Sequence, residues 1–241
     1  MRNPARMQRR TTRMTDAVHG DVGRARLLQL ASGTLPVGAY AYSQGLEWMV
    51  EAGWIGDEAT LGDWLREQLL GSIATTDLPL LLRLLAAASA DDDRTMVGLS
   101  RELVALRETS ELVRDDCARG AALARLLTDL GVDAAAGWLQ RRDTPFAALI
   151  ALAAAAWGLA SDDAAFAYSW GWLEGQILAG VKLIPLGQVA GQRLLFDLAA
   201  SIPHAIALAR QCADDDIGAS LPALALASAL HEIQYTRLFR S

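Results

Sequence analysis

Apolar residues recur every three or four positions along almost the whole chain of 241 residues. This spacing places apolar side chains on one face of a helix, and no stretch shows the strict alternation typical of a strand. Helices are predicted over residues 22–32, 41–52, 58–73, 77–89, 92–106, 109–130, 145–159, 162–183, 188–199, 202–212 and 221–232. We therefore predict an all-α fold, a single-domain bundle of about ten helices with no sheet.

Several of these helices have recognisable end signals. Asp57 and Asp77 are predicted N-caps, because a short side-chain oxygen can accept a free amide of the first turn. Thr109 followed by Glu111 is typical of a helix start, and Gly131 suits the left-handed position just after a helix end. No linker is long enough to force two domains, so one helical domain is expected over residues 21–232.

The composition agrees with a helical protein that has a sizeable core. Alanine and leucine, both strong helix formers, dominate a chain in which 52% of the residues are hydrophobic and the mean hydropathy is +0.20. The only cysteines are Cys117 and Cys212, so no disulfide framework is indicated. A reducing, cytoplasmic location is expected.

Charge is unevenly distributed along the chain. Residues 1–13 contain five arginines and no acidic residue, so the net charge of −6 becomes −11 once these five are set aside. Because phosphate binding needs clustered cations, the acidic remainder argues against nucleic acid as a partner. We expect residues 1–20 to form a disordered basic tail, and a translation start at Met14 is the alternative explanation of this segment.

Residues 144–161 raise the alternative of a membrane-associated protein. No charged residue lies between Asp143 and Asp162, and that length is near the lower limit for a membrane span. The stretch is mostly alanine, which is weakly apolar, and Thr144 followed by Pro145 is typical of a helix start. A helix buried on all sides of a soluble bundle is the better interpretation, so no membrane is expected as a partner.

The sequence lacks the common catalytic and metal-binding motifs. The single lysine, Lys182, is not part of a G-x-x-x-x-G-K-[ST] loop, and no G-x-S-x-G motif occurs. His231 and Glu232 begin an H-E-x-x-H pattern, but Tyr235 takes the second histidine position. We expect no catalytic residue, metal ligand or cofactor. The alternative is an enzyme that uses His231 and Glu232 as an acid–base pair, although adjacent helical residues point about 100° apart.

Two polar clusters lie between predicted helices. The first is the elbow, residues 34–47, which carries Tyr40, Tyr42 and Glu47. Such groups on a loop between helices favour a binding site, whereas the alternative is a helix junction whose tyrosines only pack. The second cluster runs from Lys182 through Gln188 to Arg193. It is either a hydrogen-bonding ridge for a partner or a lysine that complements the carbonyl end of a helix dipole.

The third cluster is at the C-terminus. It begins with His231 and Glu232 and continues into the C-terminal tail, residues 233–241, with Tyr235, Arg237 and Phe239. Aromatic and arginine side chains dominate the energetics of protein interfaces. The tail therefore either folds back onto its own bundle or docks on another protein, and docking is the interpretation that we favour.

Four motifs occur in a fixed order along residues 25–241. They are Leu35-Pro36-Val37-Gly38 through Ser43-Gln44-Gly45-Leu46-Glu47, Leu106-Arg107-Glu108-Thr109 with Glu111-Leu112, Lys182-Leu183 with Pro185-Leu186-Gly187-Gln188, and His231-Glu232 with Gln234-Tyr235 and Arg237-Leu238-Phe239-Arg240-Ser241. In this order they resemble the motifs of the UreF family of urease accessory proteins. Leu106, Gly175 and Ala229-Leu230 depart from the family, which usually has serine, asparagine and Met-Arg there.

The resemblance implies a non-catalytic, dimeric protein that works in a cytoplasmic complex delivering nickel to apo-urease. It implies two further partners, a UreD/UreH-like accessory protein and the GTPase UreG. Tyr40 would then meet the folded-back tail near Arg237 when the UreD-like partner binds. Partner contacts are expected at Tyr40, Tyr42, Glu47, Lys182, Gln188, Arg193, His231, Glu232, Tyr235, Arg237 and Phe239. The alternatives are modulation of the GTPase by a cation, Lys182 or Arg193, and a helical adaptor with an unrelated partner.

Overall fold

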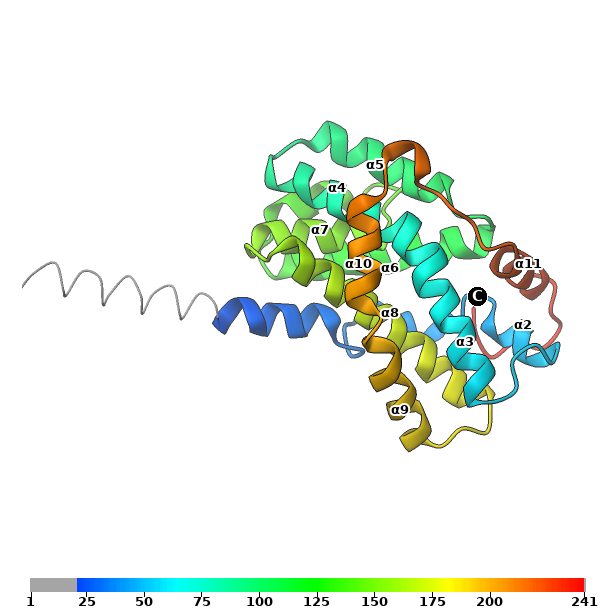
Figure 1. The fold of residues 1–241 in the computed structure, drawn as a ribbon. Helices are drawn as coiled ribbons and strands as arrows, with labels where there is room; N and C mark the ends of the chain where they lie inside the picture. Colours follow the sequence, from blue (N-terminus) through cyan, green and yellow to red (C-terminus); the bar gives the residue numbers. More distant parts are fainter. Residues whose placement is uncertain (1–20, 241) are drawn as a thin grey trace, which may run out of the picture.

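A computed structural model describes residues 21–240, and every regular element in that part of the chain is helical (Figure 1). A helix over residues 21–31 is followed by η1 (Ala39–Ala41), α2 (Leu46–Glu51), α3 (Glu58–Gln68), η2 (Leu69–Asp77), α4 (Leu78–Ser89), α5 (Asp93–Ala105), α6 (Ser110–Asp129), η3 (Asp133–Trp138), α7 (Phe146–Ala156), α8 (Ser161–Leu183), α9 (Gln188–Ala199), α10 (Ile202–Gln211), η4 (Asp214–Asp216) and α11 (Pro222–His231). The predicted all-α fold without a sheet is confirmed for these residues. The tail predicted for residues 1–20 lies outside them.

The longest helical stretch runs without interruption from Glu58 to Ser89 through α3, η2 and α4. Asp57 caps its start as predicted, since its carboxylate accepts the N–H of Thr60 at 2.8 Å. The cap predicted at Asp77 is wrong, because this residue lies inside the helix, at the end of a π-helical segment, and makes no capping bond. Its carboxylate is instead bonded to Arg107, in the loop before α6, and to the buried Tyr168 of α8.

Of the described residues, only the stretch Glu58–Ser89 is long and apolar enough by composition to cross a membrane, and 61% of its most apolar window is buried inside the structure. Core helices of soluble proteins have the same character. Residues 144–161, for which the membrane alternative was considered, contain the shorter helix α7, which does not reach that length.

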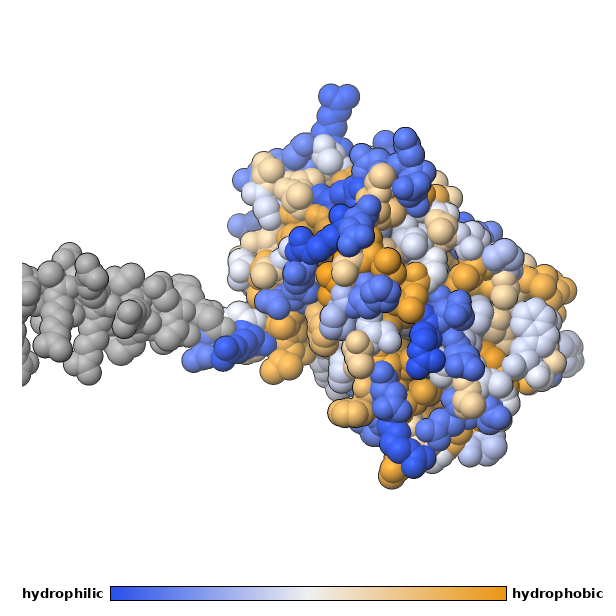
Figure 2. Space-filling model, in the orientation of Figure 1, coloured by the Kyte–Doolittle hydropathy of each residue, from blue (hydrophilic) through white to orange (hydrophobic). Residues whose placement is uncertain are grey.

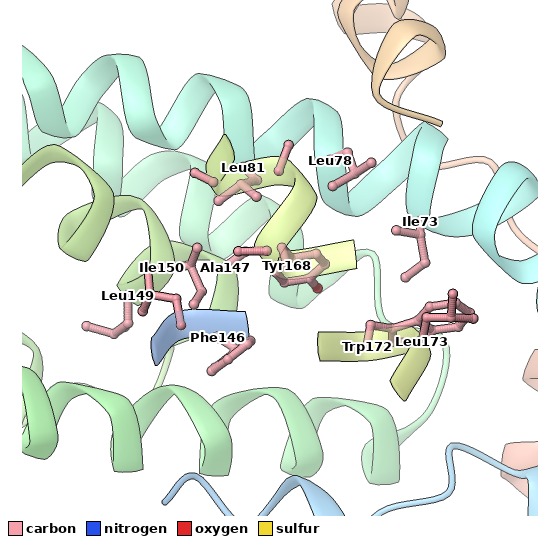
Figure 3. Packing of buried hydrophobic residues seen from close by; sticks show 14 of the residues in the cluster. Ile73, Leu78, Leu81, Phe146, Ala147, Leu149, Ile150, Tyr168, Trp172 and Leu173 are labelled. Atoms are coloured by element: carbon pink, nitrogen blue, oxygen red, sulfur yellow. The ribbon is translucent and has the colours of Figure 1, made fainter. Parts of the chain in front are cut away.

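Helix α7 lies in the centre of the core. All its residues from Phe146 to Ala154 are buried, which agrees with the prediction of a helix covered on all sides. It packs against α4, α6 and α8, and its alanines leave room for these neighbours to approach closely. Figure 3 shows Phe146 and Ala147 near Tyr168 of α8, with Leu81 of α4 on the other side.

The contact between α6 and α7 depends on two residues of α6. A Cβ atom added at Gly120 would lie 1.8 Å from the carbonyl oxygen of Thr144, so only glycine fits there. One turn earlier, the carboxylate of Asp116 accepts the N–H of Phe146 at 2.8 Å. The cap predicted at Thr144 is therefore wrong, because an aspartate from the neighbouring helix takes that role and the Thr144 hydroxyl donates to the carbonyl of Arg141.

Early and late segments of the chain meet at one end of the molecule, where α2 packs against α11 (Figure 1). The helix over residues 21–31 extends from the opposite side of the body in this view. Hydrophilic and hydrophobic residues are interspersed over the face shown in Figure 2. The elbow and the C-terminal tail both belong to the end at which α2 and α11 meet.

Candidate functional site

The elbow, residues 34–47, is less helical than the sequence predicts, because α2 begins only at Leu46. Gln44 and Gly45 have left-handed backbone conformations, with φ of 53° and 81°. A Cβ atom at Gly45 would also lie 2.9 Å from the amide nitrogen of Ser228 in α11. Glycine at this position therefore serves both the backbone turn and the close contact of the elbow with α11.

A group of ionisable side chains, here called the clasp, joins the elbow to the C-terminus, and all of its members except Arg237 are buried. It consists of Glu47, Glu111, His231 and Arg237. His231 is completely buried, with Nδ1 at 2.7 Å from Oε2 of Glu111 and Nε2 at 3.2 Å from Oε2 of Glu47. Arg237 donates to Oε1 of Glu111 at 2.7 Å. The clasp thus connects α2, α6, α11 and the tail.

The C-terminal tail is folded back onto the bundle beside the clasp. The N–H groups of Leu238 and Phe239 donate to the two carboxylate oxygens of Glu47 at 2.6 and 2.9 Å, and the N–H of Arg240 donates to the carbonyl of Ala41 at 2.8 Å. Phe239 is only 6% exposed and belongs to the core cluster. The structure therefore has the folded-back arrangement, and docking of the tail on another protein, which the sequence led us to favour, stays a prediction. Partner contact by the exposed residues of the tail stays a prediction.

Glu232 faces the start of α6. Its carboxylate accepts the hydroxyl of Ser110 at 2.6 Å and the N–H of Glu111 at 3.1 Å. The Ser110 bond in particular, with help from Glu111 and Arg114, outweighs slight burial and lowers the pKa of Glu232. Glu232 thus caps α6, while the neighbouring His231 is buried in the clasp. The two side chains do not face one substrate, and this arrangement does not support the acid–base alternative.

Lys182 lies next to the tail, with its Nζ 5.6 Å from the centroid of the Phe239 ring. Gln188 begins α9 as the sequence predicts, and both Gln188 and Arg193 are exposed. Arg193 forms an ion pair with Glu58 of α3 at 3.3 Å. The structure therefore brings Lys182 to the tail but shows no such contact for Gln188 or Arg193 within the described residues.

The elbow, the tail and Lys182 line an open groove of about 860 Å³. Large side chains on these segments are exposed: Tyr40 to 75%, Leu238 to 67% and Tyr235 completely. Tyr42 lines the same groove but is half-buried. Exposed apolar side chains that lie together mark interaction sites, so this groove is the candidate functional site.

A buried ionic cluster connected with the elbow was missed by the sequence reasoning. Nη2 of Arg107 lies 2.6 Å from Asp77 and 2.7 Å from Asp116, and the hydroxyl of Tyr168 donates to Asp77 at 2.6 Å. Burial opposes the charge of Arg107, but Asp116 and Asp77 outweigh it and raise the pKa of Arg107 well above its usual value. Burial likewise opposes ionisation of Asp116, yet Arg107 and Arg119 lower its pKa overall.

Gln44 of the elbow reaches this cluster. Its amide nitrogen donates to Asp115 at 2.8 Å, and Asp115 is paired with Arg119 at 2.5 Å. Its amide oxygen accepts the indole N–H of Trp172 at 3.0 Å. The position of the elbow is therefore fixed from α6 and α8. The signal for the cluster lay in the motif around Arg107, but sequence spacing did not show that its partner aspartates are on two other elements.

Within residues 21–240, no group of three or more histidine, cysteine, aspartate or glutamate side chains is arranged to hold a metal ion. The thiol of Cys117 is half-buried, and that burial, with Asp116 close by, raises its pKa. The site therefore offers hydrogen-bonding groups, charges and exposed apolar side chains for recognition.

Comparison with known proteins gives consistent results. A family model described as UreF matches residues 55–199. A protein of Alkalilimnicola ehrlichii is 46% identical over 228 residues, which cover 95% of this chain and 100% of the relative. A protein of Azoarcus sp. is 47% identical over 94% of this chain and 99% of the relative. One of Marinomonas sp. is 44% identical over 94% of this chain and 98% of the relative. All three relatives are named urease accessory protein UreF.

Proposed function

The chain belongs to the UreF family of urease accessory proteins, and we propose that it acts as a non-catalytic scaffold on which apo-urease is matured. In this proposal it dimerises in the cytoplasm, binds a UreD/UreH-like accessory protein and recruits a UreG-like GTPase. The assembled complex then delivers nickel to apo-urease, and any nickel binding is a property of the complex.

The observation that supports this proposal is the exposed surface of the groove, which Tyr40 and Leu238 line, together with the exposed Tyr235 on the same tail. These side chains stand on backbone that is held rigidly, because the clasp and the Ala41–Arg240 hydrogen bond join the tail to the elbow. A preformed surface binds a partner without first losing conformational entropy, which improves affinity. A UreD/UreH-like protein on this surface would extend the platform that receives the GTPase.

Deletion of residues 233–241 tests the proposal most directly. The deleted chain is expected to lose co-purification with the UreD/UreH-like protein and with UreG, and urease activity in cells should fall with it. Since the deletion also removes the buried Phe239, a second set of variants keeps the clasp intact: Tyr40→Ala, Tyr235→Ala and Leu238→Ala. Each of these is expected to weaken recruitment, while the melting temperature of the isolated chain should change no more than it does for ordinary surface substitutions.

Leu130→Ala is the matched control for these surface variants. Leu130 is an exposed apolar residue at the far end of α6, about 28 Å along the helix from Glu111 at 1.5 Å per residue. It should leave recruitment unchanged. Normal recruitment by the deleted chain and by all three surface variants would refute the proposal.

Modulation of the GTPase is part of the same proposal and rests on Lys182, an exposed cation that lines the groove. A cation placed near the transferring phosphate stabilises the charge of the transition state. Lys182→Ala is expected to keep UreG bound and to change its rate of GTP hydrolysis. Unchanged hydrolysis in the assembled complex would limit this chain to recruitment.

A further inference from the structure

A small polar cavity lies between the π-helical segment η2 and the buried ionic cluster. Its volume is about 30 Å³, and of the described residues that line it only Glu108 is exposed. Charged side chains of both signs line its wall: Asp77, Asp115, Asp116, Arg107 and Arg119. Cavities that stay empty in proteins are apolar, whereas polar cavities of sufficient size hold water. This cavity is therefore a candidate binding site.

Gln68, the last residue of α3, gives this cavity an unpaired acceptor. Its side chain is only 2% exposed, and its Oε1 atom accepts no hydrogen bond from the described residues. Buried side-chain acceptors nearly always have a partner, because burial removes the bulk water that would otherwise donate to them. The nearby guanidinium of Arg107 donates to Asp77 and Asp116 instead. The oxygen of Gln68 therefore needs a donor from a bound molecule.

The π-helical geometry of η2 brings further polar groups to the same cavity. The N–H of Leu78 donates to the carbonyl of Ile73, five residues earlier, as it does in a π-helix. Residues four or five positions apart then lie on one face, so Gln68, Ser72 and Asp77 line the cavity together. The hydroxyl of Ser72 can donate and accept, and it offers a bound molecule a second partner. Segments of π-helix are rare and occur frequently at functional sites.

Charge and volume together select the molecule that fits. A cation would meet the guanidinium groups of Arg107 and Arg119, and an anion would meet three carboxylates. A neutral molecule that both donates and accepts hydrogen bonds meets neither repulsion. A water molecule needs at least about 10–15 Å³ of such space, so the cavity has room for one or two water molecules and for no larger ligand.

We propose that this cavity is a structural water site, in which a water molecule donates to Oε1 of Gln68 and bonds to Ser72 and to a carboxylate of the ionic cluster. A buried water molecule typically makes about three hydrogen bonds of this kind. Gln44 of the elbow lines the same cavity, so the water joins α3 and η2 to the groups that hold the elbow. The inference goes beyond the proposed function, since it concerns the isolated chain and involves no partner.

A crystal structure of the full-length chain, at a resolution that shows ordered water, tests the inference. Density for one or two water molecules is expected in the cavity, with one of them about 2.5–3.0 Å from Oε1 of Gln68. A cavity without density would overturn the inference. Density for a bound ion, or a Gln68 amide oxygen bonded to another side chain, would overturn it as well.

Gln68→Met tests the same site in solution. Methionine is an unbranched helix former like glutamine, but its thioether is only a weak acceptor. Oxygen-17 relaxation dispersion counts long-lived internal water molecules, and the variant should hold at least one fewer than the wild type. Gln192→Met is the matched control, since it makes the same change at an exposed position of α9 and should leave the count unchanged. Equal counts in Gln68→Met and the wild type would overturn the inference.

The stability of Gln68→Met gives an independent readout through the direction of its change. A buried acceptor that has no partner destabilises the fold, so its removal would raise the urea midpoint of unfolding. An acceptor bonded to water loses that bond on substitution, so the midpoint is expected to fall. A raised midpoint would overturn the inference. Should the variant fail to fold, the crystal structure of the wild type decides the question.

Discussion

Arg107 is the cation that two buried carboxylates share, so its removal is a severe test of how far the buried ionic cluster stabilises the fold. In Arg107→Ala, Asp77 and Asp116 keep their buried positions but lose the guanidinium at 2.6 and 2.7 Å. Asp77 retains the Tyr168 hydroxyl, and Asp116 retains the N–H of Phe146. Neither of these bonds supplies a positive charge.

The cost follows from burial. The side chains of Asp77 and Asp116 are 1% and 2% exposed, and removal of one partner from such a buried pair costs about 3–5 kcal/mol. The free energy of unfolding of a domain is about 5–15 kcal/mol, so this is a large part of the total. With a urea dependence of roughly 3 kcal/mol per molar, the unfolding midpoint should fall by about 1–1.7 M.

Urea unfolding followed by circular dichroism measures this change. Arg101→Ala is the matched control, because Arg101 pairs with Asp143 at 2.9 Å but is 68% exposed, and a pair of that kind contributes about 0.2–1 kcal/mol. Adding Asp116→Asn to Arg107→Ala removes one stranded charge and should recover part of the lost stability. If Arg107→Ala costs no more than Arg101→Ala, the buried ionic cluster does not stabilise the fold more than an exposed ion pair does, and the reasoning is wrong.

Three further predictions address the ends of the helices and the assembly. Gly45→Ala should destabilise the chain by more than Gly53→Ala in urea unfolding. Both glycines have positive φ, which costs alanine roughly 1–2 kcal/mol, but only at Gly45 would the added Cβ atom lie 2.9 Å from another backbone atom, the amide nitrogen of Ser228. The folded state lowers the pKa of Glu232, so the stabilisation by this carboxylate is present above the ordinary carboxyl pKa and is lost as the pH falls through the pKa of the folded state. The difference in unfolding free energy between wild type and Glu232→Gln should therefore shrink on acidification. A difference that does not change with pH would contradict the capping role. Large exposed apolar side chains mark interaction sites, so we expect the 81%-exposed Phe196 to lie in the interface of the proposed dimer; Phe196→Asp should then yield a monomer in light scattering, and a retained dimer would contradict this placement.

The helices could be predicted because their signals are local. The helix predicted over residues 188–199 coincides with α9, and Asp57 caps α3 through contacts within four residues. Asp77 shows where local reasoning ends. Its position suits a cap, but the bonds that it makes are to Arg107, in the loop before α6, and to Tyr168 of α8, and tertiary packing decides those contacts. Thr144 fails for the same reason, since Asp116 reaches the same amide from α6.

The sequence named residues for the candidate site but did not show how they are arranged in space. Tyr40 and Tyr235 are exposed where a partner can reach them, and Lys182 lies at the groove. His231 and Phe239 have the same interface-like chemistry in the sequence, yet both are buried in their own chain. Composition shows that a residue can form an interface, but the fold determines whether the interface is internal.

Partner contact and tail position must therefore be tested at different residues. A substitution at His231, Glu47 or Arg237 disturbs the clasp, so lost recruitment in such a variant has two explanations: a missing contact or a displaced tail. Tyr235 and Leu238 project from the docked tail, and the bond that Leu238 makes to Glu47 uses its backbone and survives substitution. Only variants of these outward residues assign a loss of recruitment to the surface itself. A chain with both side chains reduced to alanine and a normally protected Phe239 amide separates the two explanations.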